Sequence, residues 1–287
     1  MSTWLPCPYA ADYRFDIGHV RALWPALHAV DAEPTPHSDA LWHAWALFHS
    51  GQFEQATDAG LAVGVEGLAV ANRATAAHAA LVEPQETVRI ELFKRIHARA
   101  LQHAAQRPDQ ANAWYWQGYA LAQYAQGIHV ARALAQGLGT QVRAALEATL
   151  ALAPGHAYAH VALGAFHAAV IDKVGPLVGA MTYGARADTA LSHLREAQRL
   201  APASPAVLYE CAHALLMLDG EARLAEATRL QEQAAQLPAR DAVERLWVEL
   251  ARASLALQGR IPRSRGGPPG RRTKMRGSQF ICQGGPM

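Results

Sequence analysis

Three histidines lie close enough in the sequence to present imidazoles to one metal ion: His156, His160 and His167. His156 and His160 are four residues apart, a spacing that places two side chains on one face of a helix. Zinc needs three or four ligands in matched geometry, and no cysteine or carboxylate lies at ligand spacing nearby. The pattern favours histidines that pack between helices, so we expect no metal site and no cofactor.

A nucleophilic active site is the other chemistry to consider. It needs a serine or cysteine beside a histidine base in a shaped pocket. The chain contains no Gly-x-Ser-x-Gly elbow and no P-loop, and its Gly-Leu-Gly at 137–139 is too short for a dinucleotide-binding fingerprint. We therefore expect a protein that is not an enzyme.

The segments around these histidines recur along the chain as helical hairpins. The sequence His-Val-Ala-Leu-Gly at 160–164 is matched by Trp-Tyr-Trp-Gln-Gly at 114–118 and, weakly, by Leu-Tyr-Glu-Cys-Ala at 208–212. Such a repeat cannot bury its apolar face alone, so copies stack into a solenoid. Each copy is followed by an amphipathic segment that ends at a proline: Pro154, Pro202 or Pro238.

Composition and spacing predict the fold. Alanine is abundant, which favours helix, and alternating Val/Ile/Thr runs bounded by turn residues are absent. Taking Ala40 and Ala74 as equivalent gives a spacing of 34 residues, the tetratricopeptide period. We expect an all-α protein with a right-handed α–α superhelix, a tetratricopeptide-like solenoid of about five helical hairpins.

We expect three parts. Residues 1–36 form an N-terminal arm with one helix over 17–30, and residues 37–258 form the solenoid, its first helix capped by Ser38 or Asp39. The tail, 259–287, is rich in Gly, Pro and Arg and has no apolar period, which is typical of disorder. Its abrupt onset suggests a shifted reading frame or sequence added during cloning, with a basic interaction arm as the alternative.

Two insertions lengthen the third and fourth hairpins, at 127–140 and 171–185. Both are apolar and glycine-rich, and both lie between the two helices of their hairpin. Because they occupy the same place in adjacent repeats, we expect them to lie side by side. Insertions repeated at one position map to one face of a solenoid, often the binding face.

Charge and cysteine usage bear on location and partners. The net charge of +2 arises from seven basic residues after position 258, which leaves 19 basic and 24 acidic residues in the body. We therefore expect no nucleic-acid binding by the body.

Three scattered cysteines suit a reducing compartment, with Cys211 a small buried hydrophobe. With no signal peptide and no apolar stretch long enough to span a membrane, we expect a cytoplasmic protein.

Seven segments carry a resemblance to a known family: 159–167, 170–175, 182–185, 190–194, 197–202, 210–212 and 241–246. Over roughly residues 40–257 the chain resembles tetratricopeptide-like proteins related to the regulator of microtubule dynamics proteins and to the T component of periplasmic TRAP transporters. The missing signal peptide departs from the transporter branch. The resemblance implies the solenoid fold and no defined activity.

In tetratricopeptide stacks the first helix of each hairpin lines the concave side. Transferring that register predicts a recognition groove, in which tyrosines offer apolar area and a hydrogen-bonding tip. The alternative is that most of these rings pack between neighbouring helices. The candidate groove residues are Trp45, Phe48, His49, Asn112, Tyr115, Tyr119, Gln123, Tyr158, Tyr209 and His213.

The expected function is a non-enzymatic interaction scaffold that binds a peptide or partner helix in an aromatic-lined groove. The alternative is a binding protein for an apolar small molecule, enclosed where the insertions at 127–140 and 171–185 meet the stack. An open aromatic groove would favour a peptide, whereas an enclosed apolar cavity lined by both insertions would favour a small molecule.

Overall fold

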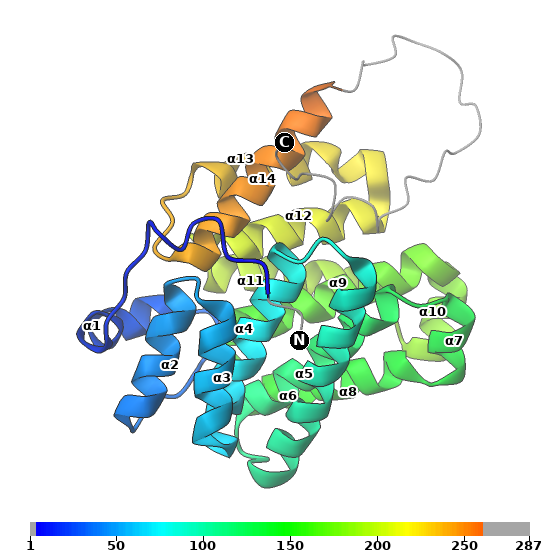
Figure 1. Cartoon of the computed structure of the whole chain (residues 1–287). Helices are drawn as coiled ribbons and strands as arrows, with labels where there is room; N and C mark the ends of the chain where they lie inside the picture. Colours follow the sequence, from blue (N-terminus) through cyan, green and yellow to red (C-terminus); the bar gives the residue numbers. More distant parts are fainter. Residues whose placement is uncertain (1–3, 261–287) are drawn as a thin grey trace.

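Helices α2 (Asp39–His49) and α3 (Phe53–Val63) form the first of five helical hairpins in the computed structural model, which describes residues 4–260 (Figure 1). Each hairpin packs against the one before it. Helix α1 (Ile17–Leu27) precedes the hairpins and α14 (Ala242–Arg260) follows them. The other hairpins are α4 (Leu68–Leu81) with α5 (Glu86–Gln106), α6 (Ala111–Gln126) with α8 (Leu138–Leu152), α9 (Ala157–Val174) with α11 (Ala187–Leu200), and α12 (Pro205–Asp219) with α13 (Leu224–Gln236).

This stack confirms the predicted all-α solenoid, since no residue from 4 to 260 lies in a strand. The expected tail falls almost wholly outside the described residues.

Ser38 caps α2 as predicted, because its hydroxyl accepts the N–H of Leu41 at 3.3 Å. The expected end of the arm helix was wrong: helix α1 ends at Leu27, where His28 leaves helical geometry.

Glycines at matching places bring the two helices of a hairpin together. A Cβ added at Gly164 of α9 would lie 2.6 Å from Cδ2 of Leu194 on α11. One added at Gly118 of α6 would lie 2.9 Å from Cγ of Leu146 on α8. Real carbon atoms do not approach so closely, so only glycine permits this packing. The repeat register read from the sequence therefore places both glycines at a helix–helix contact.

Gly164→Leu is expected to lower the free energy of unfolding by about 1–3 kcal/mol or more, because the side chain overpacks the contact between α9 and α11. Gly155→Leu is the matched control, since a Cβ at Gly155 meets no atom within 4 Å. Urea unfolding of both variants measures the difference. Equal, small losses would show that these helices have room between them.

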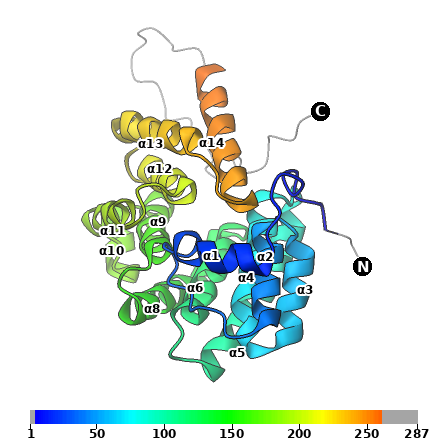
Figure 2. The same cartoon turned by 90° about the vertical axis from the view of Figure 1, so that its left-hand side faces the viewer.

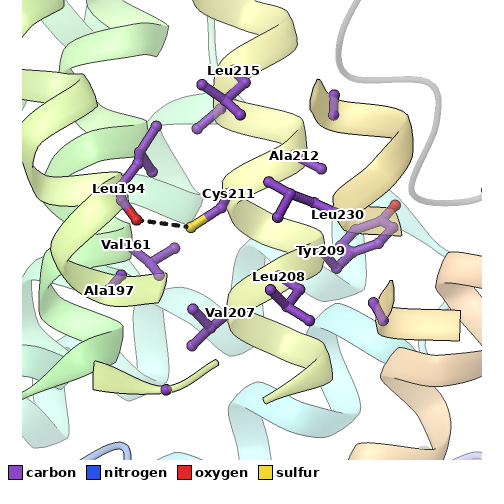
Figure 3. Close-up of a cluster of buried hydrophobic side chains, with 14 of the residues drawn as sticks. Val161, Leu194, Ala197, Val207, Leu208, Tyr209, Cys211, Ala212, Leu215 and Leu230 are labelled. Atoms are coloured by element: carbon purple, nitrogen blue, oxygen red, sulfur yellow. Dashed lines mark hydrogen bonds between the residues drawn. The ribbon is translucent and has the colours of Figure 1, made fainter. Parts of the chain in front are cut away.

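The fourth and fifth hairpins share a core of small aliphatic side chains. Figure 3 shows Cys211 among them, with Leu194 and Val161 on one side and Leu215 farther along α12. Cys211 is fully buried, and its thiol donates to the carbonyl oxygen of Leu194 at 3.7 Å. This confirms the prediction that Cys211 is a small buried hydrophobe.

The hairpins follow an arc whose two ends meet. Figure 2 shows the arc running from α3 through α5, α8 and α11 to α13, with α14 returning toward α2. Ala242 and Leu246, at the start of α14, are buried in one cluster with Trp42 and Trp45 of α2. At the turn between α2 and α3, a Cβ on Gly51 would lie 2.9 Å from that of Ala242. Contact between the last helix and the first hairpin therefore closes the arc.

The two insertions lie side by side, as expected. They contain the short helices α7 (Val130–Ala135) and α10 (Pro176–Tyr183). The backbone at Gly139 passes so close to the ring of Tyr183 that a Cβ would come within 2.7 Å of it. Arg143 donates to the carbonyl oxygen of Tyr183 at 2.6 Å. The ring–backbone contact therefore joins the two insertions, and the hydrogen bond from Arg143 ties the second insertion to α8.

Candidate ligand-binding cavity

A cavity of about 260 Å³ lies on the concave face of the arc. Its wall comes from α14 and from the first helix of every hairpin, namely α2, α4, α6, α9 and α12. The wall is mostly apolar, and the small size of alanine on these helices leaves the space open. The alanines that line it are Ala76, Ala77, Ala80, Ala122, Ala125, Ala133, Ala162, Ala165, Ala169 and Ala206.

Tyrosines from α6 and α9 form an aromatic row in this wall. The rings of Tyr115 and Tyr119 are stacked with centroids 5.7 Å apart, and those of Tyr115 and Tyr158 with centroids 6.4 Å apart. Phe48 of α2 and Trp116 of α6 also line the cavity. Such rings offer a ligand flat apolar surface and, at the tyrosines, a polar edge.

Both insertions contribute to the wall, as the small-molecule alternative requires. Ala133, Leu138 and Gly139 come from the first insertion, and Lys173, Val174 and Tyr183 from the second. The close packing of Gly139 against Tyr183 holds the two segments together at this side of the cavity.

Arg73 of α4 is the basic group deepest in the wall, and its charge is already balanced. It forms an ion pair with buried Asp31 from the segment after α1. Its guanidinium also lies over aromatic rings, 5.2 Å from the centroid of Phe48 and 5.7 Å from that of Tyr158. Stacking of this kind is favourable for a delocalised cation. Arg73 therefore joins the arm to the cavity wall.

Glu210 of α12 is the one carboxylate among the described residues that line the cavity. It is partly exposed and has no hydrogen bond or ion pair with any residue between 4 and 260, and burial raises its pKa to about 7. His213, one turn further along α12, also lines the cavity, and burial lowers its pKa. The wall thus holds an unpaired acid at neutral pH.

Six of the ten residues predicted for the groove line this cavity, and four do not. Trp45 and His49 are buried among the rings of the first hairpin and α1. Tyr209 turns away from the cavity and its hydroxyl lies 3.3 Å from that of Ser254 on α14. The expected groove positions of Trp45, His49, Asn112 and Tyr209 were therefore wrong. The six that line the cavity are Phe48, Tyr115, Tyr119, Gln123, Tyr158 and His213.

A buried chain of four polar residues, here called the clasp, fixes the closure of the arc. Asp241, just before α14, lies 2.6 Å from Nδ1 of His49 at the end of α2. Nε2 of His49 lies 3.2 Å from Nε2 of His28, whose Nδ1 lies 3.1 Å from Asp31. All four side chains are buried. The clasp therefore links the arm, the first hairpin and the last helix.

Hydrogen-bond geometry assigns the protons of the clasp. Burial lowers the pKa of His28 well below its usual value, with help from the charges of Arg73 and His49, so this ring is neutral. Nδ1 of His28 faces a carboxylate and must donate, which leaves its Nε2 as an acceptor. Nδ1 of His49 likewise faces the carboxylate of Asp241 and donates to it. Burial raises the pKa of Asp241, but His49 outweighs it and the pKa lies below its usual value.

Asn112 extends this polar layer from the arm to α9. Its amide nitrogen donates to the carbonyl oxygen of Asp31 at 2.9 Å and to Glu33 at 2.6 Å. Its amide oxygen lies 3.0 Å from Nε2 of His156, the N-cap of α9. Burial raises the pKa of Glu33 to about 8 and lowers that of His156 to about 3. Asn112 is thus a structural link between buried groups.

The three clustered histidines have separate roles. His156 accepts the N–H of Ala159 as a helix cap. His160 pairs with His193, their Nδ1 atoms 2.9 Å apart, and His167 accepts the N–H of Arg186 at 3.4 Å. Between residues 4 and 260 no group of three His, Cys, Asp or Glu side chains is arranged to hold a metal ion.

Sequence reasoning missed two features of the site. A signal for Glu210 was present, since it is the only charged residue within the apolar run 205–218. No local signal marks the pairing of His49 with Asp241, which are 192 positions apart.

Helices long and apolar enough to cross a membrane are absent from the described part of the chain. Comparison of the sequence with protein-family models and with curated proteins finds no match.

Proposed function

We propose that this protein binds a small apolar molecule in the cavity on its concave face. The observation that carries the proposal is an apolar cavity lined by both insertions, in an arc whose ends are in contact. Sites for small ligands are concave and mostly apolar, with a few polar groups that set orientation. About 260 Å³ is slightly below the usual range of roughly 300–1,000 Å³, so the ligand is small.

The proposal includes a cytoplasmic location, a tetratricopeptide-like ancestry and a role without catalysis. Free thiols at Cys7 and Cys211, both buried, support a reducing compartment. Binding of a peptide or partner helix stays a prediction. A closed arc favours a small ligand over an extended chain, because a chain needs a groove that is open along its length.

Wild-type protein is expected to bind the uncharged fluorophore N-phenylnaphthylamine with saturable enhancement of its emission. Ala165→Trp, which places an indole in the cavity, should weaken binding at least about tenfold, equivalent to ~1.4 kcal/mol. Ala225→Trp is the matched control, since Ala225 is exposed on α13 and outside the cavity. Fluorescence titration measures all three proteins, and circular dichroism checks their folding.

Absence of saturable binding by the wild type would contradict the proposal. So would equal binding by the two tryptophan variants, since the fluorophore would then sit elsewhere. Capture of a peptide that the Ala165→Trp variant still binds would favour the interaction scaffold.

A further inference from the structure

We propose that the ligand is an amphiphile with one cationic ammonium group, which pairs with Glu210 while its apolar part contacts the alanine and tyrosine wall. The inference rests on the proposed function and names the chemistry of its ligand. It follows from the charged groups that line the cavity.

Glu210 is the group that lacks a counterion. Its carboxylate lines the cavity and makes no hydrogen bond or ion pair with the described residues, 4–260. Its neighbours in the wall on α12 are Ala206, His213 and Met217, and none of them is cationic when His213 is neutral. A partly buried carboxylate without a partner is less stable than one in open water, and a ligand cation would offset that loss.

The basic groups of the wall do not call for an anionic ligand. Arg73 is paired with Asp31 and covered by aromatic rings. Lys173 is exposed at the end of α9, next to Asp172. Its charge is therefore well hydrated, whereas Glu210 is only partly exposed. The cavity selects for positive charge in the ligand.

The rings around Glu210 suit an organic cation. Burial raises the pKa of Tyr115 and Tyr119, and the nearby charge of Glu210 adds to both shifts. Aromatic faces attract ammonium groups, more strongly where water is excluded. A carboxylate beside stacked tyrosines therefore recognises an alkylammonium better than an inorganic cation, which would lose its hydration shell in an apolar cavity.

The affinity for an ammonium should depend on pH in a defined direction. The pKa of Glu210 is raised to about 7, so lowering the pH from 8 to 6 protonates it in the free protein. A protonated acid offers no charge to the ligand, so ammonium affinity should fall as the pH falls. A quaternary ammonium carries its charge at both pH values and isolates the contribution of the protein.

The test is displacement of N-phenylnaphthylamine by octyltrimethylammonium, octanol and octanoate, which share a chain and differ in charge. The ammonium is expected to bind at least about tenfold more tightly than the alcohol, and the carboxylate more weakly than either. Glu210→Gln should abolish the preference for ammonium over alcohol and the pH dependence of that preference. Glu232→Gln, at an exposed position on α13, is the matched control and should retain both.

The outcomes separate this inference from the proposed function. Failure of the fluorophore to bind would overturn both. Binding of the fluorophore with equal displacement by the three ligands, or with octanoate strongest, would overturn the ammonium inference alone. A preference that survives in Glu210→Gln would place the cation elsewhere and overturn it as well. The ratio of ammonium affinity to alcohol affinity is measured within each variant. A variant that is merely less stable therefore keeps the same ratio.

Discussion

Replacing Asp241 with alanine is expected to lower the free energy of unfolding by about 3–5 kcal/mol, because it breaks the buried pair with His49 and leaves that imidazole without its carboxylate partner. The hydrogen bond between them is 2.6 Å long and both side chains are buried. The change also removes the cap of α14, since the other oxygen of Asp241 accepts the N–H of Glu244 at 2.7 Å.

Two controls resolve these contributions. Asp241→Asn retains an oxygen for the cap but loses the charge, so the remaining loss reports the clasp. Glu196→Ala breaks an exposed ion pair with Arg199 of 2.6 Å and should change the stability little, because water screens the pair. Urea unfolding at neutral pH gives all three values. A loss for Asp241→Ala no larger than that for Glu196→Ala would show that the clasp does not hold the arc closed.

Acidification is expected to destabilise the protein through its buried neutral histidines. Burial lowers the pKa of His156 from 6.5 to about 3. A histidine with a depressed folded pKa contributes stability that is fully present above its unfolded pKa and is lost as the pH falls below it. By pH 4 the loss from His156 alone is about 3 kcal/mol, at 1.36 kcal/mol for each pH unit between the unfolded pKa and the measurement.

Comparison of wild type with His156→Asn isolates this contribution. Asparagine offers a side-chain oxygen as cap acceptor in place of Nδ1 of His156, so the variant folds with a cost at neutral pH for the lost contact with Asn112. Its stability should fall less steeply between pH 7 and pH 4 than that of the wild type. His37→Asn, at an exposed position, is the matched control. Parallel pH dependences for wild type and His156→Asn would refute the assignment of His156 as a buried neutral ring.

Local signals in the sequence were enough to predict the helices and their order. Ser38 begins α2, Gly164 marks the contact between α9 and α11, and the insertions lie against one another at Gly139 and Tyr183. Each of these depends on residues within one hairpin or its neighbour. Helix propensity, capping and small-residue packing act over that range, so they can be read from the chain directly.

The candidate site was less predictable because it depends on how the arc closes. The repeat register predicted Tyr119 and Gln123 for the groove, and both line the cavity, but it also predicted Trp45 and His49, which do not. Those two are covered by Trp24 of α1 and by His28 just after it, an arm whose position no repeat pattern specifies. Long-range partners decide which face of a concave helix remains exposed.

The clasp limits how far the solenoid can deform. In a linear stack each repeat contacts only its neighbours, so the terminal repeats unfold first and the distance between the two ends can change. Joining α14 to α2 gives the first hairpin a second neighbour and makes the stack a ring in mechanical terms. A ring cannot widen without breaking the buried bond between Asp241 and His49. The cavity therefore keeps a fixed width, and under the proposed function that width would select ligands by their cross-section as well as by their charge.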